Sequence, residues 1–377
     1  MRIAVVGAGP AGALLSHHLA RDGAAVTVFD ASHPREKPCG GGVTGKALGL
    51  LPPASPADPL PARWVSSCRF DSGEGDRVEV ALERPVAVCA RRELDAWLLR
   101  QATAAGAIHV AERVTAVDAA GGLVTSGRTE TFDLIVGADG AGSLVRRTFL
   151  APTPRARLVM ATGWFARGTS EMLVRFTPGL PGYLWLFPRP DHVGVGICAP
   201  LGAVPTSQLL GRLEREVFRS YPALVEQEGG RYAHTIPSPS ADPTCLAEIA
   251  GPRWALVGDA AALADPITGE GIYPALRSAV LLAETLRASG SPSRYPERVL
   301  ADFGRDLIRA AAIRERFYSP GFAARMIRYS ARSLAVRQVL ADLVLGEQGY
   351  VGLKRRLLRA GPRFLLEAGF SALRPAV

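Results

Sequence analysis

The chain has 377 residues, enough for more than one hydrophobic core; 48% of them are hydrophobic and 21% are charged. This globular composition, without internal repeats, excludes a disordered or solenoid protein, and the apolar runs are shorter than the roughly 20 residues that span a bilayer. The net charge is +9, but no nucleic-acid-reading motif accompanies the basic residues, so no nucleic-acid partner is expected.

The absence of a bilayer-spanning run and of a signal peptide indicates a cytoplasmic protein. Met1 leads directly into a strand pattern, which leaves no room for a signal peptide. The five cysteines are scattered and show neither metal-ligand nor redox spacing, so we expect no metal site and no disulfide framework.

The first elements in the chain form a nucleotide-binding pattern. An apolar strand at residues 3–6 leads into a glycine-rich turn and a helical pattern over residues 13–21, and a second strand, residues 25–29, ends at an aspartate. Glycines in such a turn permit the tight bend, the close approach of a pyrophosphate and the packing of helix on strand, and the aspartate can bind a ribose. The predicted site residues are Gly7, Gly9, Pro10, Ala11, Gly12 and Asp30.

Two later strand-and-turn motifs separate FAD from NAD. One strand runs into a turn that contains Asp139, and another runs into Asp259 and a second glycine-rich turn. With the first turn, they resemble the GxGxxG, DG and GD fingerprints of the flavoprotein fold of p-hydroxybenzoate hydroxylase and its relatives. The resemblance implies that Asp259 binds the FAD ribitol and that amides of the last turn face the flavin pyrimidine, where they favour negative charge. In that turn the predicted cofactor-binding residues are Pro266, Gly269, Gly271 and Ile272.

Arg91 precedes the pair Leu94-Asp95 by three residues. In the family this arginine opens a helix beside the FAD phosphates, so the resemblance implies the same role here; the alternative is a solvated charge at a helix start. Only one complete dinucleotide fingerprint is present. The electron donor, NAD(P)H or ferredoxin, is therefore expected to bind transiently, and a separate redox partner protein fits this expectation.

Two inner motifs narrow the family. The segment 36–43, Glu-Lys-Pro-Cys-Gly-Gly-Gly-Val, and the segment 181–188, Pro-Gly-Tyr-Leu-Trp-Leu-Phe-Pro, resemble the KPCGGG loop and the GYxWxFP strand of geranylgeranyl reductases. Segments 316–318 and 346–354 look like the helical tail of that family. The resemblance implies an FAD-dependent oxidoreductase that reduces C=C bonds of a geranylgeranyl or prenyl chain. Hydride would come from N5 of reduced FAD, and a proton from a donor nearby.

The substrate pocket is expected around these motifs. Tyr183, Trp185 and Phe187 alternate along a strand and so share one face, which would suit an apolar or prenyl-lipid substrate; a sheet face packed on its own helices is the alternative. Cys39 is a candidate proton donor in the glycine loop with Gly41 and Gly42, although most lone cysteines are inert. His192 and His234 lie in the same region, and each is interpreted as structural.

Two other functions stay open. A monooxygenase (hydroxylase) of the same fold would use a flavin hydroperoxide instead of direct hydride transfer, and a flavoprotein maturation partner would modify another protein. The C-terminal region alternates leucines with lysine and arginine, a pattern that allows peripheral contact with an anionic membrane and equally a helix packed on the body.

The expected architecture is α/β, α+β overall, with three parts. A Rossmann-type FAD-binding domain with a parallel sheet comprises residues 1–155 and 246–295, with a short excursion near residues 60–90 to the substrate domain. An inserted antiparallel β-sheet substrate domain comprises residues 156–245. A C-terminal helical tail comprises residues 296–377.

Overall fold

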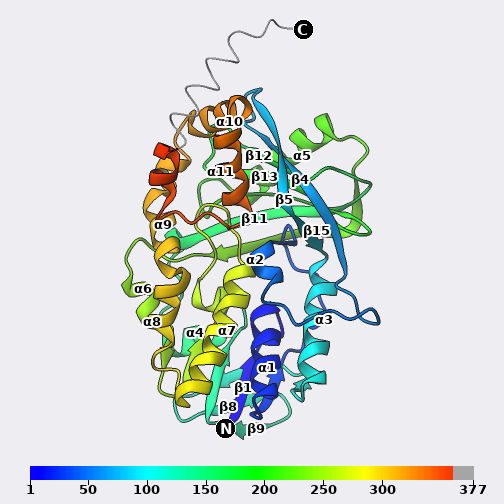
Figure 1. Cartoon of the computed structure of the whole chain (residues 1–377). Coiled ribbons are helices and arrows are strands. Elements are labelled where there is room, and N and C mark those ends of the chain that lie inside the picture. The colour runs from blue at the N-terminus through cyan, green and yellow to red at the C-terminus, as the bar shows by residue number, and fades with distance from the viewer. Residues whose placement is uncertain (360–377) are drawn as a thin grey trace, which may run out of the picture.

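The computed structural model describes residues 1–359 and places a six-stranded sheet in the lower half of Figure 1 and an eight-stranded sheet in the upper half. In the six-stranded sheet β1 lies between β10 and β2, and both pairs are parallel. β1 forms because all its residues except Arg2 are apolar and buried, as a central parallel strand requires. In sheet order the strands are β16 (Ala250–Gly251), β17 (Trp254–Leu256), β10 (Leu134–Gly137), β1 (Arg2–Val6), β2 (Ala25–Phe29) and β6 (Ile108–Val110).

Three long helices, α1, α3 and α7, pack side by side over this sheet (Figure 1). α1 begins at Pro10, whose missing N–H is no loss at a helix start, and α7 ends before Gly290, whose φ of +68° is a left-handed cap. The helices of this half and of its connections are α1 (Pro10–Arg21), α2 (Gly45–Leu48), α3 (Arg91–Ala104), α4 (Leu144–Phe149), η1 (Arg155–Arg157), α6 (Thr244–Ala247), η2 (Gly258–Ala261) and α7 (Ile272–Ser289). A small antiparallel sheet of β7 (Val114–Val117), β8 (Gly122–Thr125) and β9 (Thr129–Thr131) contacts α4.

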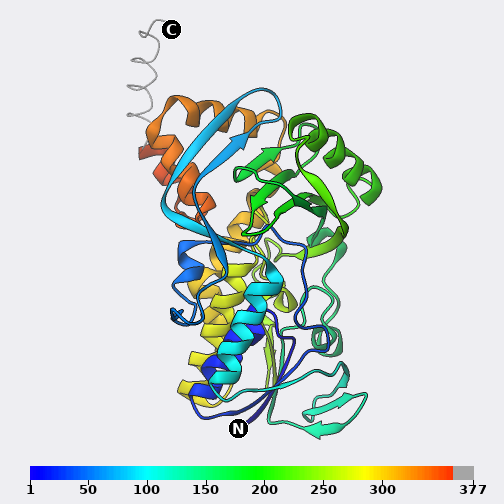
Figure 2. The same ribbon diagram turned by 90° about the vertical axis from the view of Figure 1, so that its right-hand side faces the viewer.

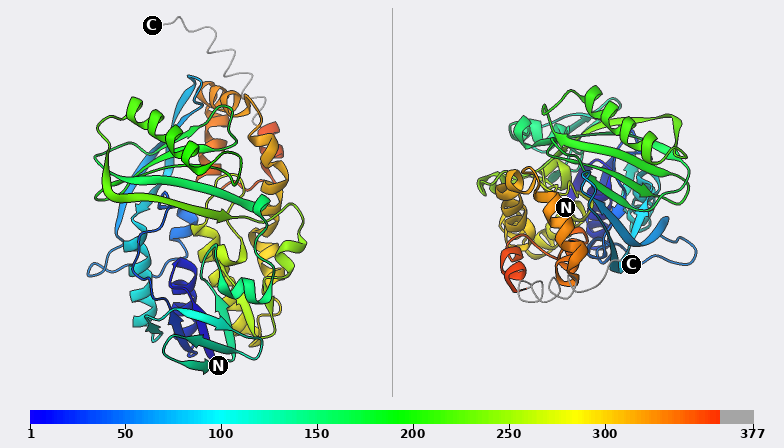
Figure 3. Two further views of the ribbon diagram at one scale, coloured as in Figure 1. Left: turned by 180° about the vertical axis from the view of Figure 1, so that it is seen from behind. Right: turned by 90° about the horizontal axis from the view of Figure 1, so that it is seen from above.

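The eight-stranded sheet spans the upper half of the molecule, as the view from behind shows (Figure 3). Helix α5 (Thr206–Ser220) packs on β11 and β14 through Leu209, Leu213 and Val217. In sheet order the strands are β15 (Val225–Pro237), β11 (Leu158–Arg167), β14 (Val193–Pro200), β13 (Tyr183–Pro188), β12 (Leu173–Phe176), β4 (Ala62–Asp71), β5 (Arg77–Cys89) and β3 (Gly42–Val43).

The C-terminal part is helical and returns to the eight-stranded sheet. α10 and α11 lie against β5 (Figure 2), so the last helices close the side of the sheet that faces away from α5. The elements are α8 (Tyr295–Val299), the π-helical turn η3 (Leu300–Gly304), α9 (Arg305–Phe317), α10 (Phe322–Arg332) and α11 (Leu334–Val344), and residues 353–359 are also helical.

The predicted fold class is confirmed: a parallel nucleotide-binding sheet, a second sheet and a helical C-terminal region. The second sheet differs from the expectation at one pair, because β12 and β4 run parallel. The reason is that β4 and β5 arrive as a hairpin from a distant part of the chain and join the sheet through one edge. The domain boundaries stay predictions, and residues 360–377 of the predicted tail lie outside the described residues.

Candidate functional site

A single cavity of about 970 Å³ runs between the two sheets, at the upper end of the roughly 300–1,000 Å³ typical of small-molecule sites. One part is lined by the loops that follow β1, β2, β10 and β17, at the carboxyl ends of strands of the six-stranded sheet. The other part is lined by the eight-stranded sheet and the C-terminal helices. The part at the carboxyl ends of the strands is where an open α/β sheet typically binds its ligand.

The three glycines of the first turn have different roles. Gly7 has a φ of +104°, and a Cβ added there would lie 2.4 Å from the carbonyl oxygen of Ala138. A Cβ on Gly12 would lie 1.9 Å from the carbonyl oxygen of Gly7. Gly9 lines the cavity and a Cβ there would meet nothing within 4 Å. Gly7 and Gly12 therefore have no room for a side chain, whereas Gly9, which is in the cavity wall with its neighbours Pro10 and Ala11, is open on the side where a Cβ would stand.

Asp30 lies at the end of β2 and lines the cavity. Its Oδ2 accepts a hydrogen bond from the backbone N–H of Ala8 at 2.9 Å, and its Oδ1 accepts from the backbone N–H and the hydroxyl of Ser32. Burial alone would raise the pKa of Asp30, but these hydrogen bonds outweigh it and lower the pKa. The carboxylate is thus held ionised in the place where it would accept hydrogen bonds from a nucleotide ribose.

Arg91 is the first residue of α3, and its guanidinium makes a buried bidentate ion pair with Asp95, both distances being 2.8 Å. It also lines the cavity. The alternative of a solvated charge at the helix start is therefore wrong, because the side chain is only 6% exposed.

Asp139 follows β10 and caps the next turn, since its Oδ2 accepts hydrogen bonds from the backbone N–H groups of Leu144 and Val145. Its Oδ1 is buried and has no partner among the described residues, although the residue lines the cavity. Burial raises the pKa of this carboxyl. A buried acceptor without a partner is costly, and a hydroxyl of a bound nucleotide would remove that cost.

Asp259, on η2 after β17, is paired with Lys37 of the KPCGGG loop, with 2.9 Å between Lys37 Nζ and Asp259 Oδ2. Burial would raise the pKa of Asp259, but the Lys37 charge and hydrogen bond lower it. His234 on β15 lines the same part of the cavity, and burial followed by the Lys37 charge lowers its pKa to about 4. The imidazole is therefore neutral, and its Nε2 is buried without a partner in the described chain.

The turn at residues 265–272 is held by Asp265, whose Oδ1 accepts from the backbone N–H groups of Ile267 and Thr268 at 2.7 and 2.8 Å. Gly269, Gly271 and Ile272 of this turn are in the cavity wall, as expected from the sequence. Pro266 and Gly12 of the first turn are buried but are not in the wall.

The predicted aromatic residues all line the cavity, and they form one wall of its second part. Tyr183 donates a hydrogen bond to the carbonyl of Thr268, so the wall is tied to the glycine-rich turn. Phe187 lies on the KPCGGG loop, because a Cβ on Gly40 or Gly42 would meet its ring at 2.7 or 3.2 Å. Cys39, Gly41 and Gly42 line the cavity too, and the Cys39 sulfur accepts the backbone N–H of Gly41 at 3.2 Å.

The Trp185 indole packs over its cross-strand partner Gly196, which has no side chain to occupy that space. A Cβ on Gly196 would lie 2.1 Å from Cζ2 of Trp185. Gly196→Ala should push the indole into the cavity and cost about 1–3 kcal/mol, to be measured by chemical denaturation and tryptophan fluorescence. Gly211→Ala, inside α5 on the far face of the same sheet, should instead raise stability by up to about 1 kcal/mol through helix propensity. Equal stability changes in the two variants would contradict this account.

Sequence reasoning found three aromatic residues of the apolar part but missed the rest of its lining, and it gave no site role to three polar residues that line the cavity. Of these three, Lys37 and Glu270 stand in segments that the motifs singled out, whereas His234 was interpreted as structural. The apolar residues come from strands and helices far apart in the chain; they include Phe70, Met172, Phe176, Phe317, Met326 and Leu340. Helical spacing in the C-terminal region is visible in the sequence, but it does not say which face meets a cavity.

These features fit FAD. Gly9, Asp30, Arg91 and the Asp139 carboxyl, whose Oδ1 has no partner among residues 1–359, suit the adenosine and pyrophosphate part. Asp259 with the turn at residues 265–272 suits the flavin part.

Comparison with known proteins supports FAD as the cofactor. Residues 1–216 match the FAD binding domain family. The fold is also that of a geranylgeranyl bacteriochlorophyll reductase-like protein of Thermoplasma acidophilum, at a TM-score of 0.77 and 20% identity over 95% of this chain and 98% of that one. Halogenase PltM in complex with phloroglucinol and FAD matches at a TM-score of 0.64 and 15% identity, over 94% and 85% of the two chains. The protein is an FAD-dependent oxidoreductase.

Sequence relatives narrow the class. Menaquinone reductase of Mycolicibacterium smegmatis is 32% identical over 321 residues, 76% of each chain, and geranylgeranyl diphosphate reductase of Synechocystis is 27% identical over 325 residues, 78% of each chain. The chain belongs to the geranylgeranyl reductase family of FAD-dependent oxidoreductases, as the motifs predicted.

Proposed function

We propose that this protein reduces C=C bonds of a prenyl chain. The observation that supports the proposal is the continuity of the cavity, which passes from the loops expected to bind the flavin into a part lined by apolar residues of the eight-stranded sheet and the C-terminal helices. Menaquinone and geranylgeranyl diphosphate, which appear in the names of the relatives, both carry isoprenoid chains of the kind that such walls accept. Among the described residues, those that the eight-stranded sheet and the C-terminal helices contribute to the cavity wall include no Asp, Glu, Lys or Arg, which suits a hydrocarbon tail there.

The roles proposed for the chain's own residues follow from their places. Reduced FAD supplies the hydride when bound. The wall of Tyr183, Trp185 and Phe187 orients the alkene and excludes water, which an unactivated double bond requires. Cys39 is the proposed donor of the proton to the neighbouring carbon. NAD(P)H or ferredoxin, bound transiently, is the proposed source of electrons for the next cycle.

An anaerobic experiment tests the proposal. The bound flavin is reduced, geranylgeranyl diphosphate or a menaquinone is added, and flavin reoxidation is followed together with the mass of the product. Reoxidation without oxygen is expected, with two hydrogens gained in the prenyl chain itself as located by fragment mass, because reduction of a menaquinone ring to the quinol would add the same mass outside the chain. Reoxidation only after oxygen is admitted, with an oxygenated product, would favour a hydroxylase and overturn the proposal.

The apolar part of the cavity can be narrowed without touching the flavin-binding loops. Met326 on α10 is partly buried and lines the cavity. Met326→Trp should raise KM for a long-chain substrate at least about tenfold while the FAD content stays that of the wild type, because the added ring fills the space that the chain would occupy. Met326→Leu conserves volume and is the control. An unchanged KM in Met326→Trp would place the substrate elsewhere.

The basic C-terminal region is proposed to touch an anionic membrane from which a prenyl lipid could enter. Leu357 and Leu358 are 41% and 69% exposed and are interleaved with the exposed residues Lys354, Arg355 and Arg359. Within residues 1–359, no helix is both long and apolar enough to cross a bilayer. Co-sedimentation with phosphatidylglycerol vesicles but not with phosphatidylcholine vesicles would support the contact; equal or no binding would refute it.

A further inference from the structure

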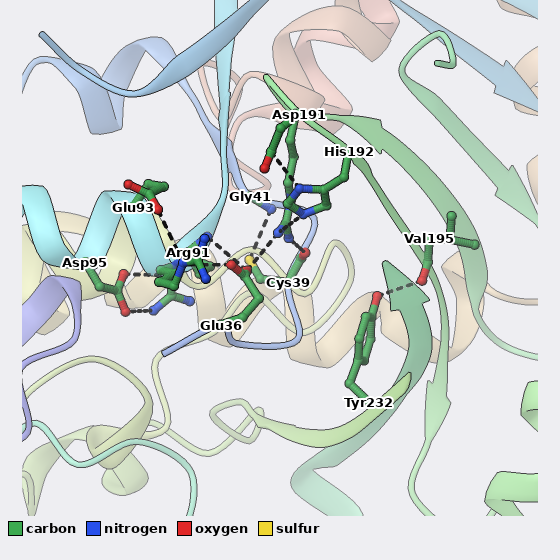
Figure 4. A network of polar contacts seen from close by, with 12 residues as sticks. Glu36, Cys39, Gly41, Arg91, Glu93, Asp95, Asp191, His192, Val195 and Tyr232 are labelled. Atoms are coloured by element: carbon green, nitrogen blue, oxygen red, sulfur yellow. Dashed lines mark hydrogen bonds and ion pairs between the residues drawn. The ribbon is translucent and has the colours of Figure 1, made fainter. Parts of the chain in front are cut away.

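Arg189 is a fully buried cation just after β13, with a side chain that is 0% exposed. A buried charge is tolerated only when it is paired and hydrogen-bonded. Its guanidinium donates to Glu36 Oε1 at 2.7 Å, to His192 Nε2 at 3.0 Å and to the carbonyl oxygen of Cys39 at 2.6 Å. Figure 4 shows the three accepting residues, Glu36, His192 and Cys39, close together. Arg189 therefore connects the turn after β13 directly to the KPCGGG loop.

The guanidinium also lies close against the neighbouring strands β11 and β14. It lies over the ring of Phe165, with 4.9 Å between Cζ and the ring centroid, and a Cβ on Gly194 would come within 3.3 Å of its Nε. Because arginine can only donate, His192 Nε2 must accept, so the His192 proton is on Nδ1, which donates to Asp191 at 2.7 Å. These contacts thus fix the orientation of the Arg189 guanidinium, a planar fork of N–H donors.

Glu36 links Arg189 to helix α3 of the flavin-binding domain. Its carboxylate accepts the backbone N–H of Arg91 at 3.0 Å and of Arg92 at 3.2 Å, and so caps the N-terminus of α3. The other end of the loop is pinned where Gly41 accepts the backbone N–H of Cys89. One arginine therefore joins the substrate sheet, the Cys39 loop and the helix that opens with the predicted FAD-phosphate residue.

We propose that Arg189 is a positioning residue, which holds Cys39 and the loop 36–42 at a fixed place between the cofactor and the aromatic wall. Lysine cannot replace it, since a single ammonium group cannot reach a carboxylate, an imidazole and a carbonyl in one plane. The use of the loop in turnover rests on the proposed prenyl reduction. The positioning itself does not, and it can be tested without a substrate.

The experiment compares Arg189→Met and Arg189→Lys with the wild type, all loaded with FAD. Cys39 is alkylated with iodoacetamide, each labelled cysteine is located by peptide mass, and hydrogen exchange is followed over residues 36–43. Loss of the fork should raise Cys39 alkylation at least about tenfold and speed exchange in this loop, with Arg189→Lys between wild type and Arg189→Met. Cys245 on α6 is the internal reference, because it is also partly buried but lies outside the network.

Arg231→Met is the matched control: it removes an arginine of the same sheet that pairs with Glu214 and Glu226 at the surface, and Cys39 should react as in the wild type. If Arg189→Met does not fold, Glu36→Gln breaks the same link from the other side and should free the loop in the same way. In turnover, kcat should fall more than KM rises.

Two results would overturn the proposal: wild-type Cys39 reactivity and loop exchange in the folded variants, or an equal rise at Cys39 and Cys245, which would mean general loosening. Failure of prenyl reduction in the wild type would refute the proposed function alone, because the labelling and exchange results stand without it.

Discussion

Gly12→Ala is expected to destabilise the apoprotein by at least about 3 kcal/mol, although alanine normally improves a helix interior by up to about 1 kcal/mol. The new Cβ would lie 1.9 Å from the carbonyl oxygen of Gly7, in a turn that is itself held by close contact with Ala138. Backbone on both sides leaves no flexible group that can yield, so β1 and α1 must separate. A loss of stability in Gly12→Ala would therefore show the backbone clash, whereas a gain would show that helix propensity prevails.

Gly9→Ala is the partner experiment, because its Cβ meets nothing within 4 Å and the φ of −69° suits any residue. The apoprotein should keep the melting temperature of the wild type, while FAD affinity falls at least about tenfold because the methyl group occupies the place where the pyrophosphate approaches the backbone. Thermal unfolding of the apoproteins and flavin-fluorescence titration measure the two quantities. A stable Gly12→Ala apoprotein, or wild-type FAD affinity in Gly9→Ala, would contradict the division of roles between the two glycines.

The parts of the site that could be predicted from sequence are local. A glycine turn between a strand and a helix has one physical interpretation, so Gly7 to Gly12 and the aspartate after β2 could be placed without the fold. Alternation along β13 likewise placed the three aromatic residues on one face, because side chains of a strand repeat every two residues.

The parts that could not be predicted depend on contacts between distant segments. Lys37 and Asp259 are 222 positions apart, and Arg189 and Glu36 are 153 apart. Neither segment alone shows which distant segment it will contact, since each pairing follows from the tertiary packing of the chain. The sequence assigns His234 a structural place for the same reason: the strand pattern does not show that its neighbour across the cavity is Lys37.

Glu270 gives the second large expected effect, a pH dependence of stability. It stands between Gly269 and Gly271 in the cavity wall, where Thr44 donates a weak hydrogen bond to it at 3.4 Å. Burial, and then the nearby Asp265 charge, raise the pKa of Glu270 to about 7, against the opposing effects of Thr44 and Lys46. The folded apoprotein therefore holds a proton on this carboxyl that the unfolded chain has already released.

The sign of the effect follows from that difference. Below pH 4.5, the ordinary pKa of a glutamate carboxyl, both states are protonated and nothing is lost. As pH rises toward 7, the unfolded chain binds fewer protons than the folded one, so the free energy of unfolding falls, by up to about 3 kcal/mol at 1.36 kcal/mol per pKa unit. Glu270→Gln removes this loss, so its stability advantage over the wild type should grow between pH 4.5 and 7 and stay constant above.

Urea unfolding of the apoproteins at closely spaced pH values measures the difference. Glu297→Gln is the control, because it makes the same chemical change on a side chain that is 76% exposed, and its profile should run parallel to that of the wild type. FAD should reduce the pH effect if it adds donors at the Glu270 carboxyl and enlarge it if it adds burial alone. A wild-type profile parallel to that of Glu270→Gln from pH 4.5 to 7 would show that this carboxyl is solvated and ionised in the folded protein, and that the glycine-rich turn carries a negative charge into the cavity.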